Sequence, residues 1–167
     1  MAKPTANPTH WTLKPDRKIK GTYFRRLDDI ECGMKKIEAS KLPPGGQFLF
    51  LYYGCEKLGK GIVGIAKQWG AEQAYRRQNL ELEELKAAAQ ATNLGVTDAE
   101  LDVLFLSYST TSARYWRNEI AHNFGPSNVE NVIQHSTTLN SRMHDFLNTY
   151  TPRVLNFLRV KYAHLLP

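Results

Sequence analysis

The stretch QFLFLYYGCEKLGKGIVGIAKQW, residues 47–69, decides the fold because its apolar residues recur with the period of an α-helix. The spacing alternates between steps of four and three residues, which places one continuous apolar face along a single helix. That face consists of Leu51, Cys55, Leu58, Ile62, Ile65 and Trp69. The glycines at positions 54, 61 and 64 would let a neighbouring element approach closely. The stretch therefore predicts a long amphipathic helix with close neighbours.

Helical patterns continue on both sides of this stretch. Residues 20–41 carry a second apolar stripe with the same alternating steps, and the prolines and glycines of residues 43–46 are expected to end it. Residues 80–92 are strong helix formers, and Gly95 supplies a stop. Two further helices are therefore predicted.

The next helix start carries a specific signal. Thr97 and Glu100 have the spacing of a capping box, in which each side chain bonds the other residue's backbone N–H. The helix that begins there is weakened, without necessarily ending, by the Ser and Thr cluster of residues 109–112. Its pattern resumes and runs to Phe124, where Gly125 and Pro126 end it.

The last part of the chain predicts one or two more helices. Ser127 and Glu130 have the spacing of a second capping box, and Thr151 with Pro152 indicates a new helix start. No convincing alternation of period two, no repeat and no low-complexity tract is visible. We expect an all-α protein, a single up-and-down bundle of five or six helices.

A chain of 167 residues is expected to form one domain, since single domains have about 100 to 200 residues. Residues 21–167 are predicted to form that domain. Residues 1–20 are predicted to be a poorly structured basic arm, interrupted by three prolines and with a net charge of +4. Its candidate RNA-binding residues are Lys14, Arg17, Lys18 and Lys20. Two interpretations of the arm stay open, a solvated terminus or a nucleic-acid-binding segment.

Composition narrows the class of partner and the compartment. The net charge of +6 and the pI near 9.3 favour a polyanionic partner, with nucleic acid ahead of an anionic membrane surface. The longest apolar run, residues 48–53, is far shorter than the roughly 20 residues of a membrane span, and prolines replace the apolar stretch of a secretory signal. We expect no membrane association and a cytoplasmic protein, with Cys32 and Cys55 packed as reduced, apolar side chains.

Three common kinds of catalytic site find little support. Residues 54–61, GCEKLGKG, superficially resemble a phosphate-binding loop, but Gly61 follows the lysine where Ser or Thr would hold magnesium, and the segment fits the helical period. The five histidines are scattered, without the paired spacing of zinc sites. No Gly-x-Ser-x-Gly motif is present. We therefore expect neither a metal nor a cofactor.

The candidate site lies in residues 114–124, RYWRNEIAHNF, near the end of a predicted helix. Asn118 and His122 are four residues apart and share a helix face. Arg117 precedes His122 by five residues and points about 140° away on a helix of 3.6 residues per turn. Convergence of the three on one phosphate requires either fraying before Gly125 or a second copy of the helix in a homodimer. We favour a homodimer formed through this helix.

These residue types suit RNA cleavage without a metal. An imidazole transfers protons near neutral pH, a guanidinium clamps a phosphate with two hydrogen bonds, and an amide orients either group. Arg114 would add a further contact to RNA. The spacing of Arg117 and His122 is weak evidence by itself, because Arg159 and His164 repeat it. Asn118, directly after Arg117, distinguishes the pair of Arg117 and His122 from the pair of Arg159 and His164.

The segment RNEIAH, residues 117–122, resembles the Arg-Asn-x3-His signature of HEPN domains, named for higher eukaryotes and prokaryotes nucleotide-binding, and the all-helical pattern agrees. The resemblance implies a helical bundle, commonly a dimer in which the two motifs face each other across a cleft. Many members are metal-independent endoribonucleases that leave a 2′,3′-cyclic phosphate, often as toxins or in defence against phage. By matching position, His122 becomes the general acid or base, Arg117 the phosphate clamp and Asn118 the orienting group.

The resemblance has one departure that concerns partners. Toxin members paired with a nucleotidyltransferase antitoxin often carry tyrosine two residues after the histidine, and here that position is Phe124. Modification of a hydroxyl at this position is therefore impossible, which puts that pairing in doubt. RNA, a second copy of the chain, and an antitoxin or regulatory protein are the expected partners.

Roles without catalysis stay open for the motif. The chain can instead be a non-catalytic module that binds RNA or a partner protein, or a structural domain whose dimer face buries Tyr115, Trp116 and Phe124. In a purely structural role, His122 caps helix carbonyls and Arg117 pairs with a surface carboxylate such as Glu119 or Asp102. The segment that contains the motif is acidic. Residues 71–130 carry a net charge of −4, so net charge alone would not have identified this segment as a binding site for RNA.

Overall fold

The computed structural model describes residues 23–161, and within that range the chain is helical without strands. The seven helices are α2 (Arg25–Ser40), α3 (Pro44–Ala66), α4 (Ala71–Tyr75), α5 (Leu82–Ala91), α6 (Asp98–Phe105), α7 (Ala113–His122) and α8 (Pro126–Lys161). The predicted all-α class is confirmed. The predicted number of helices is wrong, because the short α4 was not expected and residues 106–112 separate α6 from α7 completely.

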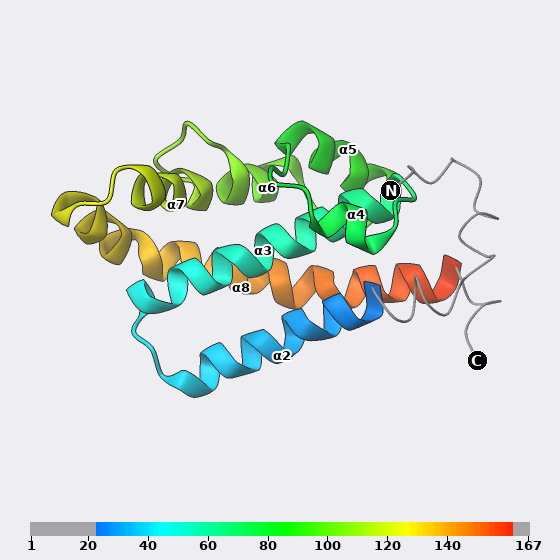
Figure 1. The fold of residues 1–167 in the computed structure, drawn as a ribbon, viewed down its shortest axis with the longest axis horizontal. Coiled ribbons are helices and arrows are strands. Elements are labelled where there is room, and N and C mark those ends of the chain that lie inside the picture. Colours follow the sequence, from blue (N-terminus) through cyan, green and yellow to red (C-terminus); the bar gives the residue numbers. More distant parts are fainter. Residues whose placement is uncertain (1–22, 162–167) are drawn as a thin grey trace.

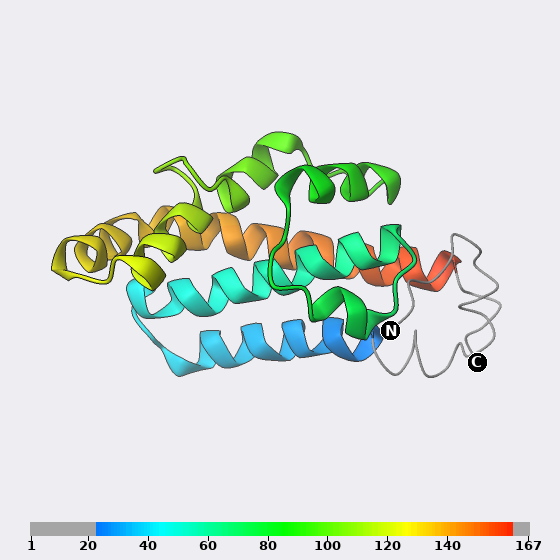
Figure 2. The same ribbon diagram turned by 45° about the horizontal axis from the view of Figure 1, so that its top comes forward.

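Three long helices form the body of the molecule. Figure 1 shows α2, α3 and α8 lying side by side along the longest axis, with α8 running in the same direction as α3 and α2 in the opposite direction. The short helices α5, α6 and α7 lead the chain back along the other side of α3 and α8, as the turned view in Figure 2 also shows. Helix α3 therefore lies at the centre and contacts α2, α4, α5, α7 and α8.

The central position of α3 follows from its apolar face. Five residues of the predicted stripe are each at most 1% exposed: Leu51, Cys55, Leu58, Ile62 and Ile65. The sixth, Trp69, is 6% exposed and lies beyond the end of α3 at Ala66. Gly64 permits the closest approach, since a Cβ at this position would overlap the side chain of Ala74 and lie 2.5 Å from the Tyr23 hydroxyl oxygen. That hydroxyl donates a hydrogen bond of 2.8 Å to the carbonyl of Trp69. A residue with no side chain is therefore required where α2, α3 and α4 meet.

Helix α8 runs without a break through Pro152, so the predicted helix start at Thr151 and Pro152 is wrong. A proline inside a helix removes one backbone hydrogen bond and crowds the carbonyl four residues earlier. The helix continues because the residues around the proline are packed in the core. Thr151, Val154 and Leu158 are at most 2% exposed. Tertiary packing overrides the local break signal here.

The other helix starts agree with the sequence only in part. At Thr97 the capping box is confirmed, with the Glu100 N–H donating to the Thr97 hydroxyl and the Thr97 N–H to the Glu100 carboxylate. The predicted capping box at Ser127 is wrong, since α8 begins one residue earlier, at Pro126. The predicted break between the first two helices is confirmed, since α2 ends at Ser40. However, α3 begins at Pro44 and includes both glycines, where a start at about residue 47 was predicted. Proline is well suited to this first helical position, where its missing N–H has no partner to lose.

The cysteines differ from each other. Cys55 is buried, as predicted, and its burial raises the pKa of the thiol well above the ordinary value. Cys32 is exposed on α2, so the prediction that it packs as an apolar side chain is wrong. None of the described helices combines the length and apolar character that a bilayer span requires. The predicted basic arm, residues 1–20, lies outside the described residues.

Candidate functional site

The motif helix α7 is anchored to α8 by Trp116. The indole N–H donates a 2.8 Å hydrogen bond to the carbonyl of Thr110, and the indole ring stacks on His135 of α8 with 5.3 Å between ring centroids. Trp116 is 6% exposed and Ala113 is fully buried. These contacts fix the rotation of α7 about its own axis. Arg114 and Arg117, on either side of Trp116 in the sequence, are thereby placed beside α3.

Both of these arginines bind the hydroxyl group of one tyrosine. Nε of Arg114 donates to the Tyr52 hydroxyl oxygen at 3.1 Å, and Nη2 of Arg117 donates to the same oxygen at 3.5 Å. The Arg117 guanidinium also lies 5.0 Å from the centroid of the Tyr52 ring, and that of Arg114 lies 5.3 Å from the centroid of Phe105. Tyr52 is fully buried, so it provides a rigid support for two cationic side chains.

Glu56, one turn after Tyr52 on α3, completes the surroundings of Arg117. Its Oε2 lies 3.4 Å from Nη2 of Arg117, and its Oε1 lies 3.2 Å from Nζ of Lys60. The three side chains are only 13–23% exposed. Burial lowers the pKa of Arg117, but the hydrogen bond to Tyr52 and the charge of Glu56 outweigh this effect and raise it, so the guanidinium stays charged. Its Nε is buried without a hydrogen-bond partner.

Asn118 and His122 have more open positions than Arg117. Asn118 is half-buried, and His122 is exposed as the last residue of α7. Within the described residues, no hydrogen bond joins His122 to Arg117 or to Asn118. A regular helix separates residues 117 and 122 by about 140°, and α7 is regular to its end. A single chain therefore does not bring the imidazole and the guanidinium together.

The two carboxylates expected as surface partners of Arg117 have other partners. Glu119 accepts hydrogen bonds from the side-chain amides of Asn123 and Asn128, each at 3.4 Å. Asp102 pairs with Lys86 at 2.8 Å. Arg117 does form an ion pair, as a structural role predicts, but its partner is Glu56, so the predicted carboxylates are wrong. Glu119 instead stabilises the turn between α7 and α8.

Sequence reasoning missed the α3 contribution to this site. Tyr52, Glu56 and Lys60 are spaced by four residues, so they lie on one face of the helix. A polar stripe on an otherwise apolar central helix was the signal that could have identified them. Of the predicted RNA contacts, Arg114 is beside the motif, while Lys14, Arg17, Lys18 and Lys20 lie outside the described residues. In residues 23–161, no three His, Cys, Asp or Glu side chains gather in a way that could hold a metal ion.

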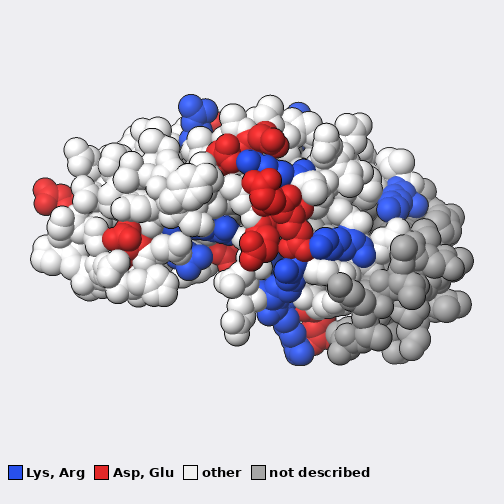
Figure 3. Space-filling model, turned by 90° about the horizontal axis from the view of Figure 1, so that it is seen from above, with Lys and Arg blue, Asp and Glu red and all other residues white. Residues whose placement is uncertain are grey.

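The surface beside α7 is not uniformly cationic. Figure 3 looks onto the layer of short helices and shows carboxylates gathered across the middle of this face, with Lys and Arg next to them. On α5 and α6, Glu84 pairs with Lys67 and with Arg77, and Lys86 pairs with Asp102. Because these charges neutralise each other, a polyanion gains little by binding over α5 and α6.

Comparison of the chain with protein-family models, with curated proteins and with solved structures finds no match. The resemblance to HEPN domains therefore depends on the six residues 117–122 and on the all-helical fold.

Proposed function

We propose that this protein is a metal-independent endoribonuclease of the HEPN type, which cuts RNA and leaves a 2′,3′-cyclic phosphate. The observation that carries the proposal is the placement of the motif. Arg117 is held charged against Tyr52 and Glu56, and His122 is exposed about one and a half turns later, at the open end of the same helix. A cytoplasmic role as a toxin or as a phage-defence effector fits this activity.

Each motif residue has a role in such a reaction. A histidine removes the proton from the ribose 2′-hydroxyl, and the 2′-oxygen attacks the adjacent phosphorus. The bond from phosphorus to the 5′-oxygen breaks, and a protonated histidine returns a proton to that leaving oxygen. Arg117 would stabilise the charge that develops on the phosphate oxygens, and Asn118 would orient the imidazole or the phosphate. No other reactant is consumed.

A homodimer would supply the second histidine and bring it near Arg117. An apolar groove of about 600 Å³ lies beside the end of α7 and is lined by the starts of α3 and α8 and by Ile120. Phe124 and Ile133, on its border, are 78% and 59% exposed. Two-fold pairing over this groove would cover both side chains and set the ends of two α7 helices side by side.

The activity can be tested directly with RNA in excess chelator. The expected result is cleavage by the wild-type protein, products that end in a cyclic phosphate, and loss of cleavage in His122→Ala. His144→Ala, which removes a half-buried histidine of α8 outside the motif, is the matched control and should cleave as the wild type does. Equal cleavage by the wild type and His122→Ala, or cleavage by neither, would contradict the proposal.

A non-catalytic RNA-binding module is the second candidate, and one observation favours it. Arg117 is already engaged by Glu56, as expected for an arginine with a structural role. This function predicts salt-sensitive RNA binding that survives His122→Ala and depends on residues 1–20. Binding of a labelled RNA at several salt concentrations, with and without those residues, separates the two candidates.

A further inference from the structure

A cationic pocket lies between α2, α3 and α4, on the side of Glu56 away from Arg117. Its volume is about 590 Å³, within the range of roughly 300–1,000 Å³ usual for small-molecule sites. Five cations line it, against the two carboxylates Glu56 and Glu72. The cations are Arg25, Arg26, Lys57, Lys60 and Arg76. The net charge of the lining, +3, favours an anionic ligand.

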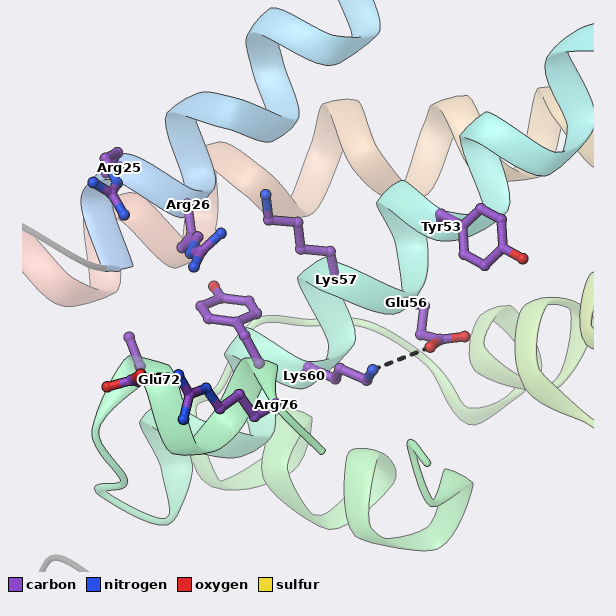
Figure 4. A pocket seen from close by; sticks show the side chains of 10 residues that line it. Arg25, Arg26, Tyr53, Glu56, Lys57, Lys60, Glu72 and Arg76 are labelled. Carbon is purple, nitrogen blue, oxygen red and sulfur yellow. Dashed lines mark ion pairs between the residues drawn. The ribbon is translucent and has the colours of Figure 1, made fainter. Parts of the chain in front are cut away.

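The cations reach the pocket from three different helices. Figure 4 shows Arg25 and Arg26 at the start of α2, Lys57 and Lys60 along α3, and Arg76 at the end of α4. Tyr53 lies at the opposite end from the two α2 arginines. Arg25, Arg26 and Arg76 therefore lie toward one end of the pocket and Tyr53 toward the other, with Lys57 and Lys60 between them.

Arg25 and Arg26 of α2 differ from the other cations of the pocket, because no carboxylate of the described residues neutralises their charge. Lys60 pairs with Glu56 at 3.2 Å, Arg76 with Glu72 at 2.6 Å, and Lys57 with Asp29 at 3.4 Å. In the part of the chain that the structure describes, Arg25 and Arg26 form no ion pair. Arg26 is instead held over the ring of Tyr75, 5.7 Å from its centroid. Adjacent unpaired guanidinium groups are a strong feature for recognising phosphate, which each can bind through two hydrogen bonds.

The aromatic end of the pocket indicates what the anion is attached to. Tyr53 is 54% exposed, unlike its neighbour Tyr52, which is fully buried. An exposed ring that lines a cationic groove is a platform on which a base can stack. Phosphate at the arginine end and a base at the tyrosine end together describe a nucleoside phosphate.

We propose that this pocket binds a nucleoside phosphate, with its phosphates on Arg25 and Arg26 and its base on Tyr53. The same chemistry is offered by a free nucleotide and by one residue of an RNA strand. Glu56 connects the pocket with the motif, since one oxygen of its carboxylate faces Lys60 and the other faces Arg117. An RNA strand in the pocket would therefore pass close to α7. The pocket site itself does not depend on whether the motif cleaves RNA.

Equilibrium binding of two probes, adenosine triphosphate and a short oligoadenylate, tests the proposal at low salt and in chelator. The double variant Arg25→Gln/Arg26→Gln should weaken binding of the preferred probe by about tenfold or more, as loss of charged hydrogen bonds implies. Lys35→Gln/Lys36→Gln removes the same charge from other positions of the same helix that do not line the pocket, and should change binding little. Tyr53→Ala should also weaken binding, by about fivefold or more if one base stacks on the ring.

The probes identify the source of the ligand. Arginine-dependent binding of adenosine triphosphate indicates a free nucleotide, and arginine-dependent binding of only the oligoadenylate indicates RNA. Binding of neither probe, or equal weakening by the two double variants, would overturn the proposal. Binding of the probes and cleavage of RNA are separate measurements on the same wild-type protein. A failure of the ribonuclease proposal would therefore appear in the cleavage assay alone.

Discussion

Oε2 of Glu56 lies 3.4 Å from Nη2 of Arg117, and this contact joins the central helix α3 to the motif helix α7. The two residues are 61 positions apart in the sequence. Both side chains are largely buried, at 13% and 23% exposed, so the ion pair is screened less than a surface pair. The charge of the motif arginine is therefore balanced by a residue of the core helix.

A double-mutant cycle of Glu56→Gln and Arg117→Gln should show that this pair stabilises the fold. We expect a coupling energy of about 1 kcal/mol, because either single variant removes this largely buried ion pair, while Glu56 keeps its contact with Lys60. The measurement is the free energy of unfolding in urea for the four proteins. A matched cycle on the more exposed pair of Lys57 and Asp29 should give less than about 0.5 kcal/mol. Equal coupling in the two cycles would contradict the role given to Glu56.

Tyr52→Phe should destabilise the protein while keeping the ring in place. Its hydroxyl accepts hydrogen bonds from Arg114 and Arg117, and phenylalanine leaves both donors without that acceptor. We expect a loss of about 1–2 kcal/mol in the free energy of unfolding. Tyr53→Phe, the same change at the neighbouring exposed tyrosine, should alter it by less than about 0.5 kcal/mol. If the two variants unfold at the same urea concentration, the Tyr52 hydroxyl does not support the arginines.

Apolar periodicity predicts the packing of α2 and α3 because a single physical rule, burial of one helix face, controls it. Leu27 and Ile30 on α2, like Leu51 and Leu58 on α3, are buried as their spacing indicates. Prolines and glycines predict the ends of helices less well than periodicity predicts burial, since they report local backbone preference alone. Pro152 lies within α8 because packing of the residues around it outweighs one lost hydrogen bond.

The sequence predicted the candidate site residues of α7, but not the residues of other helices that contact them. Spacing places Arg117 and His122 on one helix, but it carries no information about contacts with α3. The partner of Arg117 was expected among nearby acidic residues, and it is Glu56, brought close by the packing of α7 across α3. Similarly, Arg25 and Arg76 meet in one pocket only because α4 folds back beside the start of α2. Long-range contacts of this kind require the tertiary structure.

Gly64→Ala should be strongly destabilising, since the added methyl group has no space between Ala74 and Tyr23. We expect a loss of about 2 kcal/mol or more in the free energy of unfolding, because backbone and core side chains must shift. Gly33→Ala is the control on α2, where an added Cβ meets no atom within 4 Å. That variant should stabilise the protein by up to about 1 kcal/mol through helix propensity. Similar effects of the two substitutions would contradict close packing at Gly64.

Acidification should remove the stabilising contribution of Glu84. Burial raises the pKa of its carboxyl group, but hydrogen bonds from Lys67 and Arg77 outweigh this effect and hold the pKa below the ordinary value of 4.5. A carboxyl group with a lowered pKa in the folded state stabilises the fold above about pH 4.5, and this contribution is lost as the pH falls through the folded-state pKa. Glu84→Gln cannot titrate there, so the stability difference from wild type should shrink on acidification.

Urea unfolding of the wild type and Glu84→Gln at neutral pH and at several values below 4.5 measures that difference. Glu83→Gln serves as the control, because the Glu83 side chain is 87% exposed and forms only a 3.5 Å ion pair with Lys86. The difference between Glu83→Gln and wild type should be small at every pH, since exposed pairs contribute little. A Glu84→Gln difference that stays constant down to the acid transition would mean that Lys67 and Arg77 do not hold this carboxylate in its charged form.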